Sequence, residues 1–499
     1  MAPPAREAGR LRAGSLSIWE AIGISIALMA PSMAANINPQ GTVGQVGRAV
    51  PLAFVFATVG VLLISYGIVR LCQYYNHAGS VFAFVGATLG PRPGVLAGWT
   101  LIGTYCFYAC VTSAAAGIFG ADFLDRIGVW NHPPGWAQFM IAFIALGGAF
   151  VLATFPARSA TRLLLSLEGI TVLLILIVAV IVLAKIIGGS TPGNQSFDLN
   201  VFNPASGTSL GQIFKGSVFG FLSFAGFEAA ATLGEETRDP RRSIPRAILG
   251  VAIFGGIYFV FVTAVEMMGF GTSASGVAAF GSSPSLLGDL GSLYVTSSIG
   301  DIITAGTALS AFGCVIACVV GATRILYALS RDGLGTPALG VVNERTGTPV
   351  RALAVIAAVS AIAILAYRVL FTTSLFNVFL WSGVIGTLIL LIAYILATLG
   401  AMRLLWFSGP AKAPQWQMIF PILALVVLVA TIYYNVDFDN TRAFRWTYYT
   451  AGIWVLLGVA LVVALPGLSR RVGEKLQEDL GLAAEEPAEL GYGAHPAGR

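Results

Sequence analysis

The sequence predicts an all-α integral membrane protein with about twelve transmembrane helices. Of its 499 residues, 57% are hydrophobic and only 10% are charged, whereas soluble domains carry roughly 25% charged residues. Apolar runs of about 20 residues, long enough to cross a bilayer core of about 30 Å, follow one another along most of the chain. Each run must be helical, because lipid offers the backbone no hydrogen-bond partners.

Windows of this length give ten spans before residue 400 and two after it. The first five are Ile18–Asn36, Pro51–Arg70, Gly94–Phe119, Trp136–Phe155 and Leu163–Ile187. The next five are Gly211–Gly234, Ala247–Phe270, Ser297–Leu329, Leu353–Leu370 and Leu375–Leu399. The last two are Met418–Tyr434 and Tyr448–Leu465. We therefore expect a terminal segment over residues 1–16, a transmembrane domain over 17–467 and a polar, acidic tail over 468–499.

The placement of Lys and Arg predicts the orientation of these spans in the cell membrane. With the N-terminus in the cytoplasm, twelve spans return the C-terminus to the same side, and only seven of the 28 basic residues face outward. These seven are Arg48, Arg126, Lys185, Lys215, Arg368, Arg442 and Arg445. Cytoplasmic loops carry an excess of basic residues, so we expect both termini inside. The net charge of +5 does not indicate nucleic-acid binding, since the basic residues lie in short loops rather than in one patch.

Two spans carry helix-breaking or small residues at mid-depth. The first span contains Pro31 and the sixth contains Gly226. Interrupted segments at corresponding places in two halves are the best sequence pointer to a transport site. Because each half has five helices, an odd number, the halves must be inverted in the membrane. We expect repeats over about 17–188 and 211–400, with extra helices over about 417–467.

Each break predicts a set of exposed main-chain groups. Pro31 lacks an N–H group, so the helix should open over Leu28–Pro31 and leave the N–H groups of residues 32–34 unsatisfied and suited to a carboxylate. Gly226 should open the sixth span and free the carbonyl groups of Phe224 and Ala225, which suit an ammonium group. The alternatives are an ordinary proline kink and a glycine that permits close helix packing.

Acidic residues inside the membrane are costly and are therefore functional candidates. Glu228 follows Gly226 by two residues, where a carboxylate could gate the site or carry a proton. Glu168 and Glu266 lie nearer the ends of their spans, where a structural or vestibule role is favoured.

Five cysteines and three histidines are too few for a disulfide or metal framework. Cys106 and Cys110 share one helix face, as do Cys314 and Cys318. Four thiols could surround a metal ion, but small residues packing between helices are the simpler interpretation. We expect no metal and no cofactor.

Three stretches resemble the amino acid–polyamine–organocation permeases, which share the LeuT-type five-plus-five inverted repeat. The most specific stretch is Phe221–Ile248, FLSFAGFEAAATLGEETRDPRRSIPRAI, which is similar to the sixth span and following loop of that family. Arg324–Pro349 is similar to the end of the eighth span and the loop after it. A weaker match covers His77–Trp99.

The resemblance implies roles for named residues. The substrate would be held mainly through main-chain atoms of Met29, Ala30, Pro31, Ser32, Met33, Ala34, Phe224, Ala225, Gly226 and Phe227. Tyr105, Leu222 and Cys318 fall at pocket positions, while Glu228 and Trp381 fall at gating or coupling positions. This chain has Ala30-Pro31-Ser32 where relatives often have Gly-Ser-Gly. Some proton-coupled relatives place a lysine inside the fifth span, whereas that region here reads Glu168-Gly169-Ile170-Thr171, with no lysine until Lys185.

These features favour a secondary transporter that moves amino acids by alternating access, coupled to protons or working by exchange. A polyamine or other organic-amine transporter is the close alternative, and a non-transporting solute sensor of the same fold is another. A channel should repeat its filter residues, and none repeat here. An enzyme should place a nucleophile and a base, or metal ligands, at mid-depth, and histidine is absent there.

Overall fold

The computed structural model describes residues 17–75, 80–155, 158–193, 195–205, 207–233, 237–331, 334, 336–343, 346, 348–436 and 442–479. Every regular element within these ranges is a helix, as predicted. The predicted segment 1–16 and the tail after residue 479 lie outside them. So do parts of the quoted motifs, namely 77–79, 234–236 and six positions between 332 and 347.

The predicted spans correspond to twelve helical segments. The first five are α1 (Ile18–Met29) with α2 (Pro31–Val46), α3 (Val50–Tyr74), α5 (Pro91–Arg126), α6 (Gly135–Ala153) and α7 (Arg158–Ile187). The next five are α8 (Leu210–Phe224) with η3 (Ala229–Leu233), α9 (Pro240–Phe270), α12 (Ser297–Arg331), α13 (Val350–Phe371) and α14 (Leu375–Met402). The last two are α15 (Ile419–Asn435) and α16 (Arg442–Ala464). The described residues form 11 stretches able to cross a membrane, and the first, Ile18–Tyr74, contains both the first and the second predicted span.

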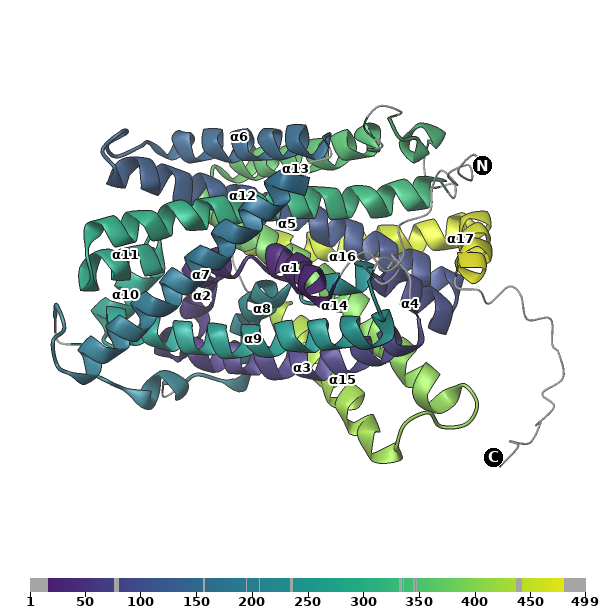
Figure 1. Cartoon of the computed structure of the whole chain (residues 1–499), viewed down its shortest axis with the longest axis horizontal. Coiled ribbons are helices and arrows are strands. Elements are labelled where there is room, and N and C mark those ends of the chain that lie inside the picture. The colour runs from purple at the N-terminus through teal and green to yellow at the C-terminus, as the bar shows by residue number, and fades with distance from the viewer. Residues whose placement is uncertain are drawn as a thin grey trace, which may run out of the picture.

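Shorter helices, which hydropathy did not predict, lie at the two ends of the bundle (Figure 1). At one end are α10 (Ala274–Ser282) and α11 (Leu286–Tyr294); at the other are α4 (Ser80–Leu89) and α17 (Pro466–Asp479). Short connecting helices are η1 (Gly47–Ala49), η2 (Leu199–Phe202), η4 (Pro337–Gly340), η5 (Arg403–Phe407) and η6 (Gln415–Met418). These helices have fewer than the roughly 17 residues that a span needs.

The start of the tail is an amphipathic helix. Leu468, Val472 and Leu476 are buried at four-residue spacing on one side of α17, and Leu476 packs over Gly86 of α4. Arg470 and Glu474 form an exposed ion pair. This part of the tail therefore lies along the end of the bundle, with its polar face outward.

The two halves of the bundle begin in the same way and pack counterpart against counterpart. Both α1 and α8 start at a capping box, formed by Ser17 with Glu20 and by Ser209 with Gln212. α2 packs against α8, α3 against α9 and α5 against α12, and Figure 1 shows α3 and α9 side by side. This is the arrangement expected of the predicted five-plus-five repeat, with the two broken spans at its centre.

Candidate functional site

The first span breaks at a single residue. Ala30 ends α1 in the left-handed conformation, with φ 44° and ψ 61°, and Pro31 is the first residue of α2. A non-glycine residue in this conformation costs about 1–2 kcal/mol. Proline is favoured at a first helical position, because its fixed φ suits the helix and no N–H partner is lost. The predicted opening over Leu28–Pro31 is therefore confirmed, and it is a true break rather than a kink.

The sixth span breaks at Gly226. α8 ends at Phe224, Gly226 has φ 96°, and helical structure resumes at Ala229. A Cβ atom built on Gly226 would lie 2.7 Å from Cβ of Leu28. Glycine is therefore required here for two reasons: the backbone has a positive φ, and α1 approaches closely. Gly226 both opens the sixth span and permits close helix packing.

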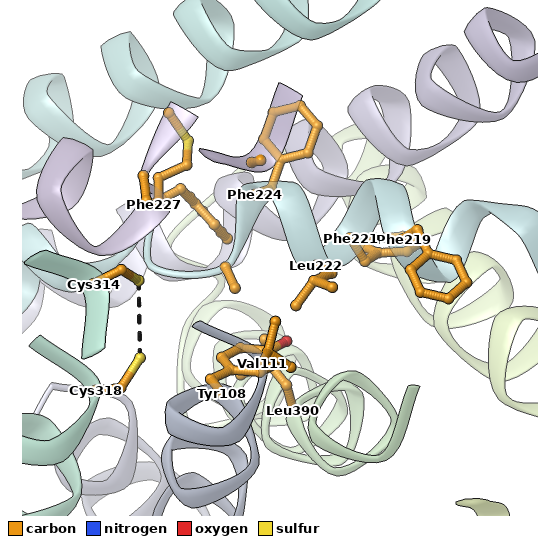
Figure 2. Close-up of a cluster of buried hydrophobic side chains, with 14 of the residues drawn as sticks. Tyr108, Val111, Phe219, Phe221, Leu222, Phe224, Phe227, Cys314, Cys318 and Leu390 are labelled. Atoms are coloured by element: carbon orange, nitrogen blue, oxygen red, sulfur yellow. Dashed lines mark hydrogen bonds between the residues drawn. The ribbon is translucent and has the colours of Figure 1, made fainter. Parts of the chain in front are cut away.

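One serine joins the two breaks. Oγ of Ser25 in α1 donates to the carbonyl oxygen of Phe227 over 3.1 Å and accepts from the N–H group of Ala230 over 2.9 Å. A carbonyl and an amide freed by the break in the sixth span are thus satisfied by the first span. The broken segments therefore form one polar junction at the centre of the bundle. Figure 2 shows Phe224 and Phe227 at this junction.

The N–H groups at the start of α2 are not free, which corrects the prediction for residues 32–34. The N–H group of Ser32 donates to Oε1 of Glu168 in α7 over 2.9 Å. That of Met33 donates to Oγ of Ser310 in α12 over 3.4 Å, and that of Ala34 donates to the carbonyl oxygen of Ala30 over 2.9 Å. The carboxylate that caps α2 in this structure belongs to the protein itself.

Several main-chain carbonyl groups at the breaks also have partners. The carbonyl oxygen of Phe224 accepts from the N–H group of Phe227 over 3.0 Å, so it is not left free as predicted. In the first span, the carbonyl oxygen of Leu28 accepts from the thiol of Cys314 over 3.1 Å, and that of Pro31 accepts from the hydroxyl of Tyr258 over 3.4 Å. Side chains of α9 and α12 thus hold the open turn of the first span.

Glu228 lies just beyond the break and is 3% exposed. Its Oε2 atom accepts from the hydroxyl of Tyr394 in α14 over 2.9 Å. Tyr105 in α5 lies near both Glu228 and Cys318, and its ring lies beside Gly321 in α12. The structure therefore brings three predicted site residues, Tyr105, Cys318 and Glu228, to one place next to the break.

Leu222 lies in the last turn of α8, just before the break. Its Cδ2 atom lies 2.9 Å from the position of a Cβ atom on Gly383 in α14, and Figure 2 shows it directed toward Val111 and Leu390. Trp381 lies in the first half of the same helix, α14. Its ring contacts Tyr367 and Phe371, with centroids 5.8 and 5.6 Å away, so it packs against α13.

Polar side chains tie α2 to the helices around it. Asn36 donates to Oγ1 of Thr307 over 3.1 Å and accepts from the N–H group of Leu287 over 2.9 Å. Asn38 donates to Oγ of Ser223 over 2.7 Å, and Gln40 binds carbonyl oxygens that flank the end of α10. These bonds fix α2 to α8, α10, α11 and α12.

A large hollow of about 540 Å³ lies away from the two breaks. It lies between α3, α7, α9 and η2, and its walls are almost entirely apolar. None of the predicted site residues lines it. It lacks the convergent polar groups of a solute site.

Three residues of this junction were not predicted from the sequence: Ser25, Tyr258 and Tyr394. A serine one turn before the predicted opening is a weak local signal for Ser25. The tyrosines lie in spans seven and ten, and their roles depend on tertiary contacts that hydropathy does not report.

Comparison with known proteins identifies the family. A model of the amino acid permease family matches residues 17–464. The chain is 26% identical over 336 residues to the low-affinity putrescine importer PlaP of Escherichia coli (strain K12), covering 66% of this chain and 69% of PlaP. It is 26% identical over 359 residues to the branched-chain amino acid permease BcaP of Bacillus subtilis (strain 168), covering 69% and 71%.

A human relative, cationic amino acid transporter 4, is 28% identical over 320 residues, covering 61% of this chain and 47% of that protein. These matches agree with the all-helical, multi-span fold and with the motif in the sixth span, and they confirm the resemblance. The chain belongs to the amino acid permease family.

Proposed function

We propose that this protein is a secondary transporter that moves amino acids across the cell membrane by alternating access. The observation that carries the proposal is the polar junction in which Ser25 joins the break at Ala30 to the break at Gly226. Helices that end at the centre of a membrane protein present main-chain groups of both signs to a small solute. Family membership, over residues 17–464, supports the same function.

The proposed substrate site is formed by main-chain atoms of the two breaks and by three side chains. Residues 29–34 and 224–227 would contact the amino and carboxylate groups of the substrate. Tyr105, Leu222 and Cys318 would contact its side chain. Glu228, bound to Tyr394, would gate the site, and Trp381 would line a more distant vestibule.

The proposed orientation places the N- and C-termini in the cytoplasm. α4 and α17 would then lie at the cytoplasmic end of the bundle, and α10 and α11 at the outer end. The charge bias of the loops supports this orientation. The contacts of Leu222 and of the polar side chains of α2 support a structure closed toward the outside. In this proposal the two repeats cover about 17–188 and 211–400, the extra helices about 417–467, and the cytoplasmic tail 468–499.

A second candidate is an organic-amine transporter. The bond from Ser32 to Glu168 favours it, because the N–H group assigned to a substrate carboxylate already binds one. The relative PlaP is named as a putrescine importer. A substrate without a carboxylate would leave that bond in place.

Uptake by purified protein in liposomes tests both candidates. Labelled L-leucine and L-ornithine should accumulate, and imposed proton gradients or internal substrate should change their rates. Putrescine and 3-methylbutylamine, which are ornithine and leucine without the carboxylate, form the matched comparison. Uptake of the amines alone would favour the second candidate. Specific binding without flux would indicate a sensor, and would contradict transport.

A further inference from the structure

Glu168 lies where the start of α2 can bind a carboxylate. Its Oε1 atom is 2.9 Å from the nitrogen of Ser32, the second residue of a 16-residue helix. Glu168 is 5% exposed and Ser32 is fully buried. Within the described residues, Oε2 of Glu168 and Oγ of Ser32 form no hydrogen bond of regular geometry, although the hydroxyls of Ser32 and Ser310 lie close to the carboxylate. The second carboxylate oxygen is therefore poorly satisfied beside an occupied helix N-terminus, where a full partner is expected.

No basic side chain balances Glu168 among the described residues. α1, α2, α9, α11 and α12 pack against α7. On α9, Tyr258 lies near both Glu168 and Glu266. From α12, Ser310 faces the carboxylate. Lys185, further along α7, donates to the carbonyl oxygen of Tyr294 instead.

Three other ionisable groups of these helices are engaged elsewhere. Cys314 of α12 donates to Leu28, Asp289 of α11 pairs with Arg126, and Glu20 of α1 caps its own helix at Ser17. The hydroxyl of Ser310 and the positive end of α2 at Ser32 are therefore the groups that stabilise a charged Glu168.

A substrate carboxylate at the start of α2 would compete with Glu168 for the N–H group of Ser32. Two carboxylates that share one buried site cannot both remain ionised, because like charges repel strongly there and neither can be hydrated. Glu168 would lose its hydrogen bond from Ser32 at the same moment. The least costly outcome is that Glu168 binds a proton when the substrate arrives.

We propose that Glu168 gives up its hydrogen bond from the N–H group of Ser32 when the carboxylate of the substrate binds there. Glu168 then takes up one proton. The proton comes from the side on which the substrate enters, and it leaves from Glu168 when the carboxylate rebinds Ser32 after the substrate departs. One proton would therefore accompany each carboxylate-bearing substrate. This inference rests on the proposed function and adds its coupling mechanism.

Proton uptake on substrate binding tests this mechanism without any mutation. Purified protein in weak buffer with a pH-sensitive dye is mixed with L-leucine or L-ornithine, and then with 3-methylbutylamine or putrescine. We expect about one proton to be taken up per bound amino acid and none per bound amine. Equal proton uptake with both members of a pair, or none with a bound amino acid, would overturn the inference.

Glu168→Gln supplies the matched variant. Its side-chain oxygen can still accept from Ser32 but carries no charge. Above the pH at which Glu168 ionises in the free wild-type protein, the Kd for L-leucine should rise about tenfold per pH unit. In Glu168→Gln the Kd should be independent of pH, whereas Glu266→Gln should keep the wild-type slope. A wild-type slope in Glu168→Gln would overturn the inference.

The two proposals fail in different ways. If none of the four solutes binds or enters liposomes, the proposed function fails, and the inference fails with it. If an amino acid is transported but binds without proton uptake, only the inference fails.

Discussion

The hydroxyl of Tyr394 in α14 donates to the buried carboxylate of Glu228, 2.9 Å away, and so ties the broken sixth span to the tenth. The same tyrosine ring packs edge-on against Phe227, with centroids 5.9 Å apart. A single side chain of α14 thus contacts two residues just after Gly226. A movement of the sixth span away from α14 would break these contacts, and on this ground we propose a gating role for Glu228.

Removing the carboxylate of Glu228 should destabilise the protein more than replacing it with an uncharged amide. Glu228→Ala leaves the hydroxyl of Tyr394 buried without its partner and should lower the free energy of unfolding by about 1–3 kcal/mol. Glu228→Gln keeps an acceptor and should cost less. Thermal unfolding in detergent measures the order of the two variants.

Uptake by Glu228→Gln should keep its dependence on pH. Uptake that no longer depends on pH in this variant would assign the coupling proton to Glu228 rather than to Glu168.

A side chain at Gly226 should abolish transport. Gly226→Leu forces a branched residue into a φ of 96° and against Leu28, so the junction cannot form in this geometry. Gly250→Leu is the matched control, because a Cβ atom on Gly250 meets no atom within 4 Å. Liposome uptake and membrane insertion are measured for both variants. Normal uptake by Gly226→Leu would remove this break from the site.

Replacing Ser25, which joins the two breaks, should lower stability and uptake more than replacing an ordinary buried serine. Ser25→Ala leaves the carbonyl group of Phe227 and the N–H group of Ala230 without their partner, at a cost of about 1–3 kcal/mol each. Ser65→Ala is the control, since Oγ of Ser65 binds only Val61 in its own helix. We expect a clearly lower thermal midpoint and slower uptake for Ser25→Ala. Equal effects of the two variants would argue against a special role of the bridge.

Leu222 and Gly383 should behave as a complementary pair. Gly383→Leu fills the space that Leu222 occupies and should slow uptake, because α8 and α14 can no longer pack closely beside the break. Leu222→Ala in the same protein restores that space and should recover part of the rate. Residues in contact show such coupling in double-mutant cycles. Strictly additive effects on uptake would mean that the two residues do not meet in the transport cycle.

The sequence predicts the span order well because lipid imposes a simple rule on length and polarity. The breaks at Pro31 and Gly226 can also be predicted from the local sequence, because proline lacks an N–H group and glycine lacks a side chain. Both features depend on residues near one another in the chain. The capping boxes at Ser17 and Ser209, which mark equivalent starts of the two halves, are local in the same way.

The partners of the broken helices could not be predicted from the sequence. Ser32 meets Glu168 and Glu228 meets Tyr394 only after distant spans pack together. The general rule that a helix start leaves N–H groups unsatisfied therefore led to the wrong expectation of free amides at residues 32–34. The rule itself holds, since side chains and the preceding turn satisfy these groups.

The central claim is that the substrate binds between the two helix breaks. Its most direct measurement is an experimental structure of the protein with the solute that liposomes accumulate. We predict that the bound solute lies between residues 29–34 and 224–227, with Tyr105 and Cys318 at its side. A solute bound instead in the apolar hollow between α3 and α9, with both breaks unoccupied, would contradict the account.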